Sequence, residues 1–139
     1  GMRRLTEEVV NELQPYGQSI SAEIQALQQG RGTIPEQEFA QRSQAVQQRI
    51  AEAEQLEQVR TQELEYTLSQ QRTAMARAVD PILVAVYQER GCGILLSGEA
   101  VYEANPQMDI TDMVIQRLNV QLPSLSFNRM PVPVQQPAQ

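Results

Sequence analysis

The sequence predicts a mainly α-helical fold with a small β part, in which a long antiparallel helical hairpin is attached to a short β-containing body. Three observations predict it. Residues 36–79 contain no Gly or Pro and are dominated by Gln, Glu, Ala and Arg, which favour helix. A glycine-containing break over residues 30–32 separates this stretch from an earlier amphipathic segment. Short apolar runs over 94–96 and 100–102, separated by Ser-Gly, are typical of a β-hairpin.

The first helix is expected over residues 5–29, because apolar side chains recur there every three or four positions. The stripe consists of Val9, Leu13, Tyr16, Ile20, Ile24 and Leu27. Pro15 removes a backbone donor within the stripe and crowds the preceding turn, so we expect a kink at this point and not an end.

The turn of the hairpin is expected near residues 30–35. Thr33 and Glu36 have the spacing of a capping box, in which each side chain binds a free backbone N–H at the start of the next helix. Pro35 suits the first turn of that helix, where a missing N–H costs nothing. Helices joined by so short a break should fold back on one another.

The second helix is longer than the first, and this mismatch predicts additional neighbours. With the turn centred near residue 32, Arg3 is expected beside Thr61, which leaves residues 62–90 without a helical partner in the chain. Either an N-terminal segment is missing or other subunits cover this stretch. The opening Gly-Met resembles an expression scar, so we expect a native leader or first strand to have preceded it.

Asp80 and Pro81 are suited to be the N-cap and first residue of a new helical segment, so a bend is expected there. We therefore assign residues 3–80 to a coiled-coil arm and residues 81–119 to the body.

A lone hairpin over 94–102 is marginal in water, so it needs strands from a missing segment or from another subunit. Residues 120–139 are rich in Pro, Ser and Gln and are predicted to be an unfolded tail.

Composition argues against several classes of function. The chain has no His and no Lys, and its formal net charge is -6. It therefore lacks the usual general base, the commonest metal ligand and the clustered cations that nucleic acid requires. Cys92 is the single cysteine, so neither an internal disulfide nor a cysteine zinc site can form. We expect no enzymatic activity, no cofactor, no metal and no nucleic-acid partner.

Two patterns could suggest chemistry, and both have a simpler interpretation. The glycines around Cys92 resemble a phosphate loop only faintly, because no strand precedes them and no Lys follows. The carboxylates between residues 52 and 65 are expected to form a solvated helix face.

Specific motifs are concentrated in residues 81–119. They are Pro81-Ile82-Leu83, Ala85-Val86, Gly91-Cys92-Gly93-Ile94-Leu95-Leu96, Ala100-Val101-Tyr102, Ala104-Asn105-Pro106 and Asp109-Ile110-Thr111-Asp112. In these motifs and in the order of its elements the chain resembles the Skp/OmpH family of periplasmic chaperones of Gram-negative bacteria. The resemblance spans about residues 3–119, and the arm matches by architecture alone.

The resemblance implies a homotrimer in which strands form a small β-barrel body and three arms enclose a cavity. Such chaperones hold unfolded outer-membrane proteins without ATP and prevent their aggregation. The body residues that it implies are Ile94, Leu95, Leu96, Val101 and Tyr102, with Ile110, Val114 and Leu118 packed onto them.

The chain departs from the family pattern at two places. The family's opening strand is missing. The arm tip carries only Arg31 and Arg42 against Glu36 and Glu38, whereas well-known members are strongly basic there. We therefore carry over no lipid-binding site and expect no direct membrane binding.

Apolar residues near the arm tip allow two interpretations. They are Tyr16, Ile20, Ile24, Leu27, Ile34 and Phe39. In the first interpretation they only join the two arm helices. In the second, some of them face the cavity and contact apolar client segments.

The alternative to a chaperone is a structural coiled-coil adaptor that binds one defined partner.

Overall fold

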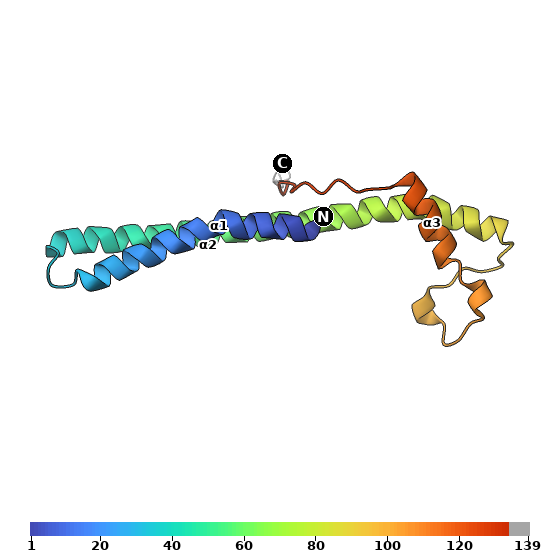
Figure 1. The fold of residues 1–139 in the computed structure, drawn as a ribbon, viewed down its shortest axis with the longest axis horizontal. Coiled ribbons are helices and arrows are strands. Elements are labelled where there is room, and N and C mark those ends of the chain that lie inside the picture. Colours follow the sequence, from blue (N-terminus) through green and yellow to red (C-terminus); the bar gives the residue numbers. More distant parts are fainter. Residues whose placement is uncertain (134–139) are drawn as a thin grey trace, which may run out of the picture. The chain divides into compact units, whose positions relative to one another are not determined.

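The computed structural model describes residues 1–133 and has three α-helices and two 3-10 turns in that range (Figure 1). They are α1 (Met2–Gln29), α2 (Glu36–Glu89), η1 (Gly98–Ala100), η2 (Pro106–Met108) and α3 (Thr111–Gln121). Contacts divide the chain into two compact units. The first unit holds residues 1–68 and 127–133, the second holds residues 69–126, and α2 contributes to both.

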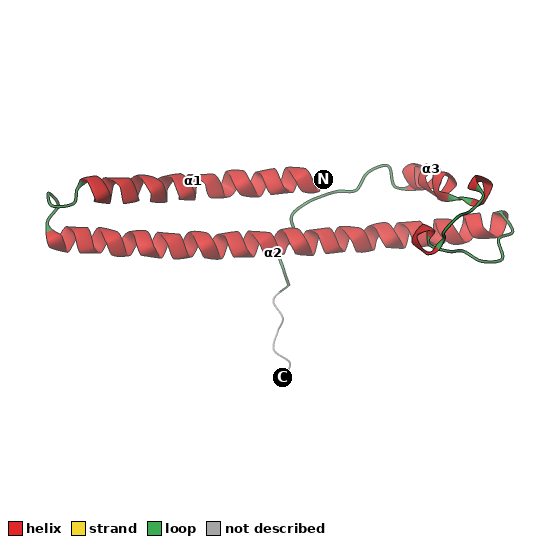
Figure 2. Cartoon of the chain, turned by 90° about the horizontal axis from the view of Figure 1, so that it is seen from below, coloured by secondary structure: helices red, strands yellow, loops and turns green. Residues whose placement is uncertain are grey.

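The first unit is an antiparallel helical hairpin, which confirms this part of the predicted fold. Figures 1 and 2 show α1 lying alongside the first part of α2. Helix α1 supplies the buried side chains Leu5, Val9 and Leu27, the last two from the predicted apolar stripe, and α2 supplies Val46. Pro15 lies inside α1 without ending it.

The turn between the helices corrects the predicted capping box. Gly32 adopts a φ of 89°, which favours glycine, and α2 begins only at Glu36. Thr33 therefore lies before the helix start, and its hydroxyl donates to the Gly30 carbonyl at 3.0 Å. The first helical bond of α2 runs from the Phe39 N–H to the Pro35 carbonyl at 2.9 Å. The Pro35 carbonyl thus accepts the first bond, and the proline lies just before the helix, where its missing N–H costs nothing.

The register between the helices agrees with the prediction near the tip and differs farther along. The Arg42 Nε lies 2.9 Å from the Glu23 Oε1, close to the expected pairing. The Arg60 Nη2 lies 2.7 Å from the Glu12 Oε1, whereas an even advance from the turn would place Arg60 beside Arg4. The first unit extends to Leu68, beyond the predicted Thr61.

In the second unit, α2 continues through Pro81 to Glu89, so the predicted start of a new helix at Asp80 is wrong. The reason is tertiary packing. Ile82 and Val86 form a buried cluster with Ile110 and Val114, and burial of an apolar face stabilises a helix more than local propensity does.

The short helix predicted after Asp109 is confirmed as α3. The Asp109 carboxylate accepts a hydrogen bond from the Thr111 N–H at 2.8 Å and so satisfies a free donor at the helix start. The Arg117 Nη1 lies 2.8 Å from the Glu89 Oε1 and joins α3 to the end of α2.

The predicted β-hairpin over 94–102 is not formed within the chain. Residues 1–133 contain no strand, and Figure 2 accordingly shows none in the part of the chain that is described. At the expected turn, the Ala100 N–H bonds to the Ser97 carbonyl at 2.9 Å and the Val101 N–H to the Gly98 carbonyl at 3.2 Å, which produces η1. Two short apolar runs have too few internal contacts to hold a ladder without further strands.

The predicted unfolded tail is also corrected in part. Residues 120 and 121 complete α3, and residues 127–130 contact the helices of the first unit. Composition does not reveal these contacts because they join partners that lie far apart in the sequence. Residues 134–139 lie outside the described part of the chain.

Candidate functional site

A hollow of about 230 Å³ lies near the tip of the first unit. Side chains of both helices and Arg31 of the turn contribute to it. It is lined by Ile24, Leu27, Gln28, Arg31, Phe39, Ser43, Val46 and Gln47.

The hollow brings together three of the six residues predicted to contact clients, namely Ile24, Leu27 and Phe39. Leu27 is buried, as expected of a residue that joins the helices. Ile24 is 37% exposed, so it offers surface to another molecule. Leu27 is therefore placed as the first interpretation of the tip residues requires, and Ile24 has the exposure that the second requires.

The other three predicted residues lie outside the lining of the hollow. Tyr16 is 47% exposed on α1, whereas Ile20 and Ile34 are half-buried. The Ile34 side chain covers Gly30, where an added Cβ would collide with it.

Sequence reasoning missed the polar lining residues Gln28, Arg31, Ser43 and Gln47, together with Val46 as a member of the site. In α2 the spacing of the lining residues could have indicated that they share one helix face. Phe39, Ser43, Val46 and Gln47 are spaced four, three and one residues apart, and side chains three or four positions apart share one helix face. In α1 the equivalent signal was Ile24 followed by Gln28.

Arg42, which lies next to the hollow, is paired with carboxylates. Arg42 donates to the Glu23 carboxylate, and this hydrogen bond holds the pKa of Glu23 below its ordinary value. Glu38 lies 3.9 Å from the same guanidinium. The tip therefore offers apolar surface, amides and the exposed guanidinium of Arg31, whereas Arg42 is bound to carboxylates.

A second apolar surface lies on the loops of the second unit. Ile94, Leu95, Leu96, Tyr102 and Met108 are exposed there. The first four were predicted to build the body, and Val101 is half-buried. Of the remaining predicted body residues, Ile110 and Val114 are buried and Leu118 is half-buried in the core of the unit. Clustered exposed apolar side chains are typical of interaction surfaces.

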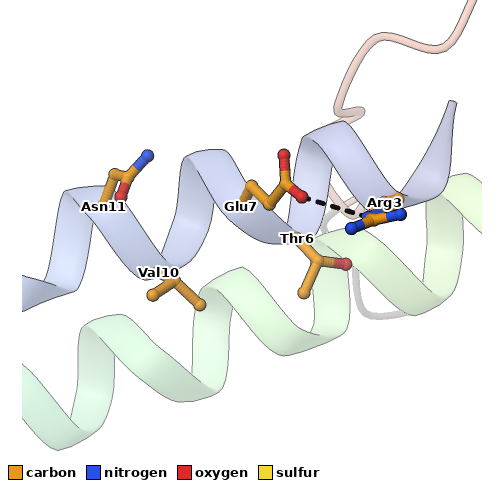
Figure 3. A pocket seen from close by; sticks show the side chains of 5 residues that line it. All are labelled: Arg3, Thr6, Glu7, Val10 and Asn11. Atoms are coloured by element: carbon orange, nitrogen blue, oxygen red, sulfur yellow. Dashed lines mark hydrogen bonds and ion pairs between the residues drawn. The ribbon is translucent and has the colours of Figure 1, made fainter.

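A larger hollow of about 440 Å³ lies at the start of α1 (Figure 3). It is lined by Arg3, Thr6, Glu7, Val10 and Asn11. The Arg3 Nε lies 3.2 Å from the Glu7 Oε1, and both side chains are well exposed. Such a pair on the surface of one helix contributes little binding energy.

Chemistry-bearing groups are sparse in residues 1–133. This part of the chain has no group of three or more His, Cys, Asp or Glu side chains placed to hold a metal ion. Cys92 is a free thiol and is half-buried. None of the helices described here combines the length and the apolar character that a membrane span requires.

The chain is a helical hairpin with partly exposed apolar side chains near its turn and exposed apolar side chains on the loops of its second unit. The sequence matches the family of outer membrane proteins (OmpH-like) over residues 2–118, so the chain belongs to the OmpH-like family of outer membrane chaperones. The predicted resemblance is thereby confirmed.

A solved structure supports the same assignment. The crystal structure of an OmpH-like protein from Caulobacter crescentus CB15, described as an outer membrane chaperone, is similar with a TM-score of 0.88 and 29% identity. The similarity covers 97% of this chain and 79% of that chain. None of the curated proteins compared with the chain matches it.

Proposed function

We propose that this protein is an ATP-independent holdase chaperone of the periplasm that encloses unfolded outer-membrane proteins between helical arms and prevents their aggregation. The observation that carries the proposal is the partly apolar hollow at the tip of an OmpH-like hairpin, with Ile24 exposed at it and Tyr16 exposed farther along α1. Membership of the OmpH-like family supports it.

The composition of the hollow suits weak and numerous contacts. Aliphatic and aromatic side chains alternate with the amides of Gln28 and Gln47, which can either donate or accept hydrogen bonds. Each Å² of apolar surface that a client covers contributes about 25 cal/mol, so a small contact remains reversible. A client is then retained without being fixed in one conformation.

The exposed loop residues of the second unit are proposed to be the surface on which three copies of the chain assemble. In a single chain, Ile94, Leu96 and Tyr102 leave apolar side chains in water. Strands contributed by neighbouring subunits would cover them and complete the β part that one chain does not form.

Binding by this mechanism uses no cofactor, nucleotide or catalytic group. The formal charge of -6 disfavours association with anionic lipid surfaces, so direct membrane binding is not part of the proposal. The clients are expected to be recognised through their apolar segments.

The proposal is tested by light scattering during dilution of several unrelated outer-membrane proteins out of urea. A holdase suppresses the scattering of all of them in the absence of ATP. Suppression for one protein alone, with tight binding to that protein, would instead identify an adaptor.

A further inference from the structure

Residues 127–130 lie against both helices of the first unit, and Arg129 makes the central contact. Its Nη1 lies 2.9 Å from the Glu12 Oε2 on α1. Its Nε lies 3.2 Å from the Glu63 Oε2 on α2. One guanidinium from the end of the chain thus bridges the two helices of the hairpin.

The two carboxylates that Arg129 contacts carry more negative charge than their other partner, Arg60, can neutralise. Glu12 and Glu63 both bind Arg60, which lies 2.7 Å and 3.0 Å from them. A single guanidinium leaves two carboxylates with one excess negative charge. Arg129 completes a group of two cations and two anions, and Glu63 within it is only 13% exposed. Shielding from water makes an uncompensated charge costly.

The backbone of the segment is held as well. The Met130 N–H donates to the Thr67 Oγ1 at 2.9 Å, and the Thr67 hydroxyl donates in turn to the Glu63 carbonyl at 2.7 Å. Thr67 has no exposed surface, so its hydroxyl depends on protein partners. A backbone bond combined with a side-chain ion pair is typical of recognition of an extended segment.

The other end of the segment is attached to the start of α1. Arg4 donates a hydrogen bond to the Phe127 carbonyl. The Phe127 ring lies so close to Gly1 that an added Cβ there would collide with it. The contacts therefore continue from Phe127 to Met130.

We infer that Glu12, Glu63 and Thr67 form a docking site for an extended segment that carries an arginine, and that residues 127–130 of the same chain occupy it as a clasp. The clasp fastens the N-terminal half of α1 to α2. Residues 127–130 lie after residues 2–118, the part of the chain that matches the family. The inference does not depend on the proposed chaperone function.

Limited trypsin digestion of the full chain, followed by mass spectrometry, tests the clasp directly. Trypsin cleaves after arginine, and the bond after Arg129 is protected while its side chain is bound to two carboxylates. The bond after Arg31, at the hairpin turn, provides an internal reference. We expect slower cleavage after Arg129 than after Arg31 in the unmodified protein.

Two variants and a matched control make the test specific. Glu12→Gln combined with Glu63→Gln should speed cleavage after Arg129 about tenfold, because it removes two charge-assisted bonds and raises the undocked population. Thr67→Val should also speed it through loss of the Met130 contact. Glu23→Gln breaks an ion pair of the same kind near the tip and should leave it unchanged. Circular dichroism confirms that each variant remains helical.

Two results would overturn the inference. Equal cleavage after Arg129 and Arg31, unaffected by the Glu12 and Glu63 changes, would show that the segment is not docked. Protection that grows with protein concentration would show that the segment comes from a second copy, and it would refute the assignment to the same chain.

Discussion

Arg60 on α2 donates hydrogen bonds to Glu12 on α1 through two nitrogens. The Nη2 lies 2.7 Å from one carboxylate oxygen, and the Nε lies 3.1 Å from the other. This bidentate pair joins the two helices far from the turn of the hairpin. Two parallel bonds between planar groups also restrict rotation and sliding of the helices. The pair therefore contributes to alignment as well as to attraction.

Replacing Arg60 with Gln should destabilise the hairpin. The change leaves Glu12 and Glu63 with Arg129 alone, and the expected loss is about 1 kcal/mol in the free energy of unfolding, since the group is partly exposed. Urea denaturation followed by circular dichroism measures it. Arg3→Gln is the matched control because the Arg3 pair with Glu7 lies on one exposed helix face. An equal effect of both changes would show that Arg60 has no special role.

Acid should weaken the same contact. Hydrogen bonds from Arg60 and then Arg129 lower the pKa of Glu12 from 4.5 to about 2. Because the folded pKa lies below the unfolded one, the stabilisation is complete above about pH 4.5 and is lost as the pH falls toward 2. The melting temperature should therefore fall more steeply over this range in the unmodified protein than in Glu12→Gln. Glu63 and the two arginines face the carboxyl, and they remain in both proteins.

Parallel pH profiles of the two proteins would contradict this assignment. Other carboxylates with lowered pKa, such as Glu23 and Glu89, titrate in both proteins. The difference between the profiles therefore isolates Glu12.

The core of the second unit should be sensitive to truncation at Val86, which has no exposed surface. Val86→Ala removes buried methyl groups and leaves a cavity, so a loss of about 2 kcal/mol is expected. Val84 lies two residues away on α2 and is 54% exposed. Val84→Ala should change the free energy of unfolding by much less, and equal losses would argue against the observed orientation of α2.

The exposed loop of the second unit should control assembly. Leu96→Gln places an amide on the proposed subunit surface and should lower the mass measured by light scattering from three chains to one. Val120, at the end of α3, is more exposed than Leu96 and provides a control. Assembly that survives Leu96→Gln but fails in Val120→Gln would place the interface elsewhere.

The hairpin could be predicted because its determinants are local. Apolar spacing sets the buried face of α1, and Gly32 supplies the positive φ that the turn requires. The start of the second helix was predicted too early, because Thr33 has the spacing of a capping box with Glu36 whereas α2 begins only at Glu36. The absence of a new helix start at Pro81 could not be predicted, because burial of Ile82 and Val86 outweighs the local signal of Asp80 and Pro81.

Contacts between residues that lie far apart in the sequence were harder to predict. Ile24, Leu27 and Phe39 were identified near the tip because they belong to apolar stripes, whereas Gln28 and Arg31 carry no comparable pattern. The docking of Arg129 on Glu12 joins residues 117 positions apart. Nothing in a Pro-rich composition indicates such a partner.

The most direct test of the central claim compares Ile24→Gln with Val59→Gln in suppressing aggregation of an unfolded outer-membrane protein. Both residues are β-branched, lie within helices of the first unit and are similarly exposed, at 37% and 40%, but only Ile24 lines the hollow at the tip. Ile24→Gln should raise the light scattered by the client, and Val59→Gln should leave it unchanged. Equal suppression by both variants would contradict the central claim.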